Sequence, residues 1–255
     1  MREFCAGVLI IGSLLWEAEK FDREAWRRDR LDVQAQQAVK TRTRYGRRST
    51  SRSNSYTMVF SGSARSGVGM MLPCHNPVRG EDDLFVEADL LAIAEGLGAS
   101  RSWRDFGVVG ILCNHSSSDL QPIIQNWPKY FQEHISANCK VVALSAPREA
   151  PSIREDGFLN IDWPKSIDLG VPNSCDILLA TATAPTLSAE GAYPTAAKIA
   201  QAWLAAKSAN YFKNNVLAGI RAADDAEIWR HIEEAAPHWI ETTDYKKVGA
   251  ILQQC

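Results

Sequence analysis

The sequence has no long hydrophobic run, almost no net charge and no cysteine pair at metal-binding spacing. Its apolar stretches fall far short of the roughly 18 to 20 residues that span a bilayer, so we expect no membrane-spanning segment. The formal net charge is −2 over 255 residues. This balance argues against a general nucleic-acid binder, although Arg and Lys crowd the region from Arg23 to Arg52.

The six cysteines are scattered and form no Cys-x-x-Cys pair, and the five histidines are isolated from one another. Neither a zinc site nor a small disulfide framework is therefore indicated, and we expect no metal and no cofactor. The first residues do not resemble a secretory signal, because Arg2 is offset by Glu3 and Trp16 and Glu17 follow the first apolar run. A reducing cytoplasm, with the cysteines as small hydrophobic side chains, fits this pattern best.

Strand patterns dominate the first two thirds of the chain and helical patterns the last third. This segregation predicts an α+β protein with a mixed, strongly bent or barrel-like, antiparallel-rich sheet and flanking helices. We assign residues 1–193 to this domain and residues 194–255 to a helical C-terminal extension packed on it. The expected strands are 7–11, 38–46, 55–61, 66–73, 106–114, 140–147 and 175–185, and the expected helices are 82–98, 224–235 and 244–254, with further helix from residue 194.

Residues 7–16, "GVLIIGSLLW", read as a buried strand that breaks at Gly12 and Ser13. The break is either a simple strand-ending turn or a backbone cradle for a ligand. It lacks the Gly-x-Gly-x-x-Gly spacing of a dinucleotide-binding loop. Two features further along the chain bear on the choice: the Arg-containing segment 39–61, "VKTRTRYGRRSTSRSNSYTMVFS", and "GVGMML" at 67–72 followed by "LLAIAEGLG" at 90–98.

In this order the three segments resemble the gamma-glutamylcyclotransferase-like family, where an apolar strand delivers a Gly-Ser loop to the active site. The resemblance covers roughly residues 7–114. It departs from the family pattern at Ile11, where the family commonly has Tyr, and this change removes a hydroxyl. The resemblance implies an enzyme that cyclises a gamma-glutamyl compound to 5-oxoproline and releases an amine or amino acid.

Glu95, in "AIAEG", is the general base that the resemblance implies, with Glu87 as an alternative two helical turns earlier. The resemblance also implies that the backbone amides of Gly12, Ser13 and Leu14 face the developing oxyanion. We expect the whole loop, from Ile11 to Leu15, to line the largest pocket.

Lys40, Arg42 and Arg44 alternate, so they share one face of a strand, and Arg42 or Arg44 is our candidate for binding a substrate carboxylate. Arg47 and Arg52 lie in a Ser-rich connector that we interpret as a solvated loop. The alternative function is a catalytically inactive member of the fold that binds an anionic small molecule or a protein partner. The sequence does not determine the oligomeric state.

Overall fold

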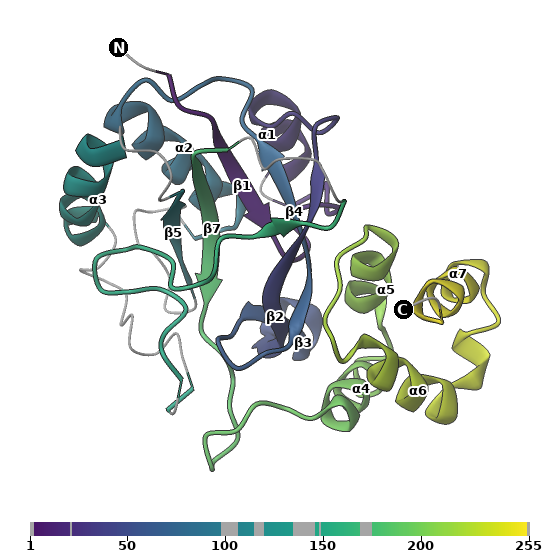
Figure 1. The fold of residues 1–255 in the computed structure, drawn as a ribbon. Coiled ribbons are helices and arrows are strands. Elements are labelled where there is room, and N and C mark those ends of the chain that lie inside the picture. Colours follow the sequence, from purple (N-terminus) through teal and green to yellow (C-terminus); the bar gives the residue numbers. More distant parts are fainter. Residues whose placement is uncertain are drawn as a thin grey trace.

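The computed structural model describes residues 3–20, 22–97, 107–114, 120–134, 146–147, 149–168 and 175–253, and it has the expected α+β architecture. These residues form one seven-stranded sheet with the strand order β3-β2-β4-β1-β7-β5, and β6 pairs with β2. Figure 1 shows the sheet at the centre of the molecule, with α2 and α3 on one side and α4–α7 grouped on the other. The predicted fold class is confirmed.

The sheet is mixed and antiparallel-rich, as expected, and it is not closed into a barrel because β3 and β5 lie at its two ends. Among the strand pairs of the described residues, only β1–β7 is parallel. The expected strand at 140–147 lies almost entirely outside the described residues. The strands are β1 (Ala6–Ile10), β2 (Gln37–Ser49), β3 (Ser55–Phe60), β4 (Ser66–Pro73), β5 (Gly107–Cys113), β6 (Lys165–Ser166) and β7 (Ile177–Thr183).

The helices fall into two groups along the chain. In the first group, α2 packs against β5 and α3, and α1 packs against α2. In the second group, α4 packs against β3 and α6, and α5 packs against α7. The helices are α1 (Arg23–Arg30), α2 (Glu81–Ala94), α3 (Gln121–His134), α4 (Ala196–Ala205), α5 (Asn210–Leu217), α6 (Asp225–Ala235) and α7 (Thr243–Leu252), with 3₁₀ turns η1 (Thr50–Arg52) and η5 (Pro237–Trp239).

β1 is buried along its whole length because it lies between β4 and β7. Its continuous apolar sequence is the pattern expected of a strand that is covered on both faces. The strand stops at Ile10, and the chain then leaves the sheet in the Gly12–Ser13 turn. The polar turn is thereby delivered to the edge of an apolar core.

β1 pairs with β4 only over Met70–Pro73, and the C-terminal extension pairs with β4 just before that stretch. Val68 of β4 and Arg221, which follows α5, exchange two backbone hydrogen bonds of 2.9 Å each. Gly67 allows this approach, because a Cβ at that position would overlap the carbonyl oxygen of Arg221. The extension is also packed on the sheet through Tyr45 of β2, whose ring lies edge-on to Trp203 at 5.0 Å between centroids. The division of the chain into a domain at residues 1–193 and an extension at residues 194–255 stays a prediction.

Candidate functional site

A cavity of about 310 Å³ opens where β1 ends, and the Gly12–Ser13 turn forms part of its wall. Ile11 and Leu14 from the same turn also line it, whereas Leu15 does not. A larger hollow of about 740 Å³ lies between the β2–β3 connection and α4, so the expectation that this loop lines the largest pocket is wrong. Of the candidate residues, the smaller cavity contains Ile11, Gly12, Ser13, Leu14 and Glu95.

The Gly12–Ser13 turn uses its carbonyls in internal hydrogen bonds but not its first backbone amides. Its carbonyls are used internally, since Leu15 N–H donates to Gly12 O at 3.1 Å and Glu17 N–H donates to Ser13 O at 2.8 Å. Within the described part of the chain, the amides of Gly12, Ser13 and Leu14 make none of these turn bonds. The bonds of the turn itself therefore leave these three amides unused.

Glu95 lies in the same cavity, at the C-terminal cap of α2. Gly96 follows it with φ of 74°, a left-handed conformation that ends the helix and suits glycine. The Glu95 side chain is 23% exposed, and its Oε2 lies 3.2 Å from Arg23 Nη2. Burial raises the pKa of the Glu95 carboxyl above its ordinary value, while Arg23 and Arg47 oppose the rise. A carboxyl with raised proton affinity, held in a partly desolvated cavity, is suited to proton transfer.

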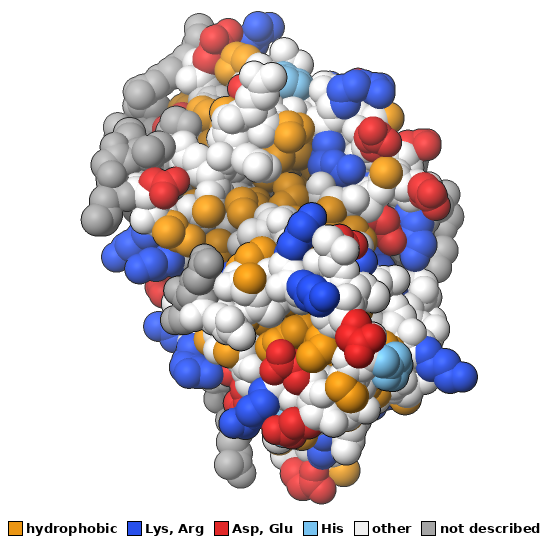
Figure 2. Space-filling view, turned by 90° about the vertical axis from the view of Figure 1, so that its right-hand side faces the viewer, with side chains coloured by type: hydrophobic (Ala, Val, Ile, Leu, Met, Phe, Trp, Pro, Cys, Tyr) orange, Lys and Arg blue, Asp and Glu red, His pale blue; other side chains and the backbone are white. Residues whose placement is uncertain are grey.

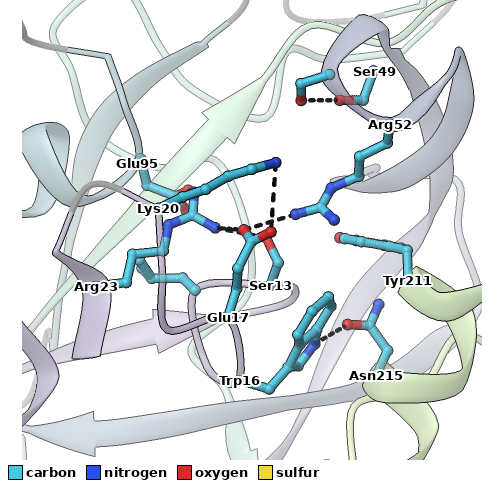
Figure 3. Close-up of polar contacts among 12 residues, drawn as sticks. Ser13, Trp16, Glu17, Lys20, Arg23, Ser49, Arg52, Glu95, Tyr211 and Asn215 are labelled. Carbon is cyan, nitrogen blue, oxygen red and sulfur yellow. Dashed lines mark hydrogen bonds and ion pairs between the residues drawn. The ribbon is translucent and has the colours of Figure 1, made fainter.

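Glu17 lies at the centre of the charged cluster in the cavity, between three cationic side chains (Figure 3). Its carboxylate accepts hydrogen bonds from Arg23 and from Arg52, the latter at 2.8 Å, and Lys20 Nζ lies 3.6 Å away. Arg23 also donates to Ser13 Oγ at 2.9 Å and to the carbonyl of Ala94 at 2.8 Å. Arg23 thus connects the Gly-Ser turn to the end of α2.

Arg47 reaches the cavity because β2 contains a β-bulge. The register shifts between Tyr45 and Arg47, so that Arg47 pairs with Thr57, and both line the cavity. Gly46, at the bulge, lies so close to Val59 and Tyr193 that a Cβ there would fall 2.7 Å from the Val59 side chain. The bulge therefore changes which of the arginines on β2 faces the site.

Arg42 and Arg44 precede the bulge and do not line the cavity. Arg42 is exposed, donates to the carbonyl of Gly62 at 2.8 Å and lies 3.6 Å from Asp162. The Arg44 guanidinium lies over the ring of Tyr193, 4.3 Å from its centroid. The carboxylate-binding role that we assigned to these two residues has no geometric support, and the arginines that the cavity does contain are Arg23, Arg47 and Arg52.

Glu87, the alternative base, lies outside the cavity in a separate hollow. Its side chain is only 8% exposed and forms an ion pair with Arg30. A second bond, from Arg30 Nε to the other carboxylate oxygen, measures 3.3 Å. Of the two carboxylates, the structure therefore brings Glu95, and not Glu87, to the Gly-Ser turn.

The C-terminal extension supplies one wall of the cavity through Tyr211 of α5. Its hydroxyl accepts a hydrogen bond from Met58 N–H at 3.3 Å. A Cβ on Gly12 would overlap this hydroxyl, so the glycine is required by the close approach of Tyr211. Trp16 Nε1–H donates to Asn215 Oδ1 at 2.8 Å, and this bond links the segment after the turn to α5. The sequence analysis missed Tyr211 and Asn215, because no local pattern marks a contact across about 200 residues.

No family model matches this sequence, and no curated protein and no solved structure matches it either. In the described ranges, no three His, Cys, Asp or Glu side chains are grouped as a metal ion would require. None of the helices in the described part of the chain is long and apolar enough to cross a membrane.

Proposed function

We propose that the protein is a gamma-glutamylcyclotransferase-like enzyme, which converts a gamma-glutamyl amide or peptide to 5-oxoproline and releases an amine or amino acid. The observation that carries this proposal is that Glu95 and the residues Gly12, Ser13 and Leu14 of the turn line one cavity. The three segments of the sequence resemblance thus meet in space, although they are separated in the chain. We also propose a cytoplasmic location, which is consistent with the free thiols of Cys5, Cys74, Cys113 and Cys175.

The reaction needs little from the protein besides proton transfer and charge stabilisation. The α-amine of the substrate attacks its own γ-carbonyl, so nucleophile and electrophile are already tethered and much of the entropic barrier is removed. Glu95 accepts the proton that the α-ammonium must lose, and then returns a proton to the leaving amine. The amides of the Gly-Ser turn stabilise the oxyanion that forms at the γ-carbonyl.

Tyr211 compensates for the hydroxyl that is missing at Ile11. Both residues line the cavity, and the Tyr211 hydroxyl lies directly over Gly12. Burial raises the pKa of Tyr211. The phenol therefore stays neutral at physiological pH and retains an O–H donor for a substrate oxygen.

A second candidate is a binding protein for an anionic small molecule, without catalysis. It is favoured by the ion pair between Arg23 and Glu95, at 3.2 Å, because a carboxylate held by an arginine is a weaker base. In this case Glu95 would serve to position Arg23 for the ligand.

The deciding experiment measures 5-oxoproline release from a panel of gamma-glutamyl amines and dipeptides. Glu95→Gln keeps the size of the side chain but removes its basicity, and we expect turnover to fall on the order of 10²- to 10⁴-fold with little change in KM. Glu87→Gln is the matched control, because this carboxylate lies outside the cavity. Full activity in Glu95→Gln would contradict the proposed base, and ligand binding without release of 5-oxoproline from any substrate would favour the second candidate.

The pH dependence of the cyclisation rate is an independent test of the role of Glu95. The active form of Glu95 is the carboxylate, and burial raises its pKa. The rate should therefore rise with pH through a value above the ordinary range for Glu, and Glu95→Gln should lose this limb of the profile. A profile with the same acidic limb in both proteins would assign that titration to another group.

A further inference from the structure

Residues 47–52, which comprise the end of β2 and the 3₁₀ turn η1, form a wall of the cavity. All six residues except Arg48 line it. Ser49 is 4% exposed, and its hydroxyl lies 3.1 Å from that of Ser51. The Arg52 side chain is 18% exposed. This segment is therefore part of the site and not the solvated loop that its composition suggests.

The cavity carries an excess of positive charge. Its lining includes four cationic side chains, Lys20, Arg23, Arg47 and Arg52, but only two carboxylates, those of Glu17 and Glu95. Unbalanced charge in a partly desolvated site is unfavourable unless an ion or ligand of opposite sign compensates it. On the molecular face that carries the C-terminal helices, by contrast, acidic and basic side chains are intermixed (Figure 2).

A gamma-glutamyl group does not remove this excess. Its α-carboxylate and α-ammonium cancel, so two positive charges in the cavity remain to be balanced by the rest of the ligand. A single carboxylate on the leaving portion would balance one of them. A phosphate monoester, with close to two negative charges at neutral pH, balances both.

The geometry of the wall suits a phosphate group. Arg52 is held in place on several sides, since its guanidinium lies over the rings of Tyr211 at 5.0 Å and Trp16 at 5.6 Å, and its Nη2 donates to Glu17. Hydroxyl donors of Ser49, Thr50 and Ser51 lie on the same wall. Figure 3 shows Ser49 and Arg52 on the other side of Glu17 from Glu95, so a phosphate there would lie away from the reacting end.

We propose that Arg47, Arg52 and the hydroxyls of residues 49–51 form an anion subsite that binds a phosphate monoester on the leaving portion of the substrate. Planar guanidinium groups and hydroxyls are the donors that proteins use for tetrahedral oxyanions. The assignment of the phosphate to the leaving portion rests on the proposed function. The existence of the subsite does not, because it follows from the charge and donors of the cavity.

The first test measures binding without catalysis. Phosphoethanolamine is titrated into the full chain by calorimetry, with ethanolamine, which has the same ammonium group but no phosphate, as the counterpart. We expect binding of phosphoethanolamine alone, and a loss on the order of 10- to 100-fold in affinity for Arg52→Gln, the usual effect of removing a charged donor. Arg42→Gln is the matched control, because Arg42 is an exposed arginine on β2 outside the cavity.

Folding of Arg52→Gln is checked by thermal unfolding, and Ser51→Ala provides a milder second variant on the same wall. Ser51→Ala should weaken phosphoethanolamine binding several-fold. Equal affinity of wild type, Arg52→Gln and Ser51→Ala for phosphoethanolamine, or no binding by the wild type, would overturn the subsite.

The second test compares cyclisation of gamma-glutamyl-phosphoethanolamine and gamma-glutamyl-ethanolamine. We expect KM of the wild type to be at least tenfold lower for the phosphorylated compound, and this advantage to disappear in Arg52→Gln. Equal KM values, with 5-oxoproline released from both compounds, overturn the subsite and leave the proposed function standing. Phosphoethanolamine binding that depends on Arg52, with no 5-oxoproline from either compound, supports the subsite and contradicts the proposed function.

Discussion

Replacement of Gly12 by Ala tests whether the Gly-Ser turn and the C-terminal extension are in direct contact. A Cβ on Gly12 would overlap the hydroxyl oxygen of Tyr211, and the next nearest atom, Tyr211 Cζ, would lie at 3.5 Å, an ordinary contact distance. The tyrosine is 7% exposed and bonded to Met58 N–H, so it has little room to move. The clash therefore comes from one oxygen atom on a constrained ring.

The cost follows from these contacts. Inserting a methyl group into a packed site destabilises by about 1–3 kcal/mol, and loss of the Met58–Tyr211 hydrogen bond adds roughly 1 kcal/mol. For a chain of this size, a loss of about 2–4 kcal/mol lowers Tm by roughly 5–15 °C. The variant should also bind ligands of the cavity more weakly, since Tyr211 is displaced from the wall.

A double-mutant cycle with Tyr211→Phe isolates the contact. Removing the hydroxyl leaves Cζ as the nearest atom, so Gly12→Ala should cost little when Phe is present at position 211. Urea unfolding of the four proteins should give a coupling energy of about 1–3 kcal/mol. If Gly12→Ala destabilises the wild type and the Tyr211→Phe background equally, the proximity of the turn and α5 is refuted.

Two further predictions concern buried carboxyls. Asp225 is 2% exposed, and burial raises its pKa to about 8, above its unfolded value. Its contribution to stability is therefore fully present below the ordinary pKa of Asp and is lost as pH rises through 8, by at most about 1.4 kcal/mol per pH unit. Asp225→Asn should flatten this decline in urea unfolding between pH 5 and 9, and parallel curves for the two proteins would contradict the assignment. Glu87→Gln should lower the free energy of unfolding by about 1–3 kcal/mol, because it weakens the ion pair with Arg30, while leaving the cyclisation rate per folded molecule unchanged. A lower rate at unchanged stability would place Glu87 in the active site.

Sequence patterns located the strands well because each buried strand carries a β-branched or apolar run bounded by turn residues. β4, predicted as residues 66–73, spans Ser66–Pro73 in the structure.

Helix α3 was not among the helices expected from the sequence. Its segment, Gln121–His134, contains Pro128 in its interior, and proline is a helix-breaking signal in a local analysis. Tertiary packing of Trp127 and Phe131, both fully buried, outweighs that local preference.

The candidate site was only partly accessible from the sequence. The Gly-Ser turn and Glu95 could be named because they belong to recognisable local segments. Arg47 and Arg52 were assigned to a solvated loop by composition, whereas β2 continues to Ser49 and contains a bulge at Gly46 that composition does not reveal. The contributions of Tyr211 and Asn215 depend on how α5 docks, and docking is a property of the whole chain.

Along one edge, β4 pairs first with Arg221 of the extension and then with β1, and this shared edge links ligand binding to the docking of the extension. One part of β4 pairs with β1 and another part pairs with Arg221, so the turn that follows β1 and the extension adjoin the same strand. A ligand that requires both the turn and Tyr211 binds this arrangement alone, and it stabilises the arrangement by RT ln(1 + [L]/Kd). Amide hydrogens of α5 should therefore exchange more slowly when the cavity is occupied, although most of that helix never touches the ligand.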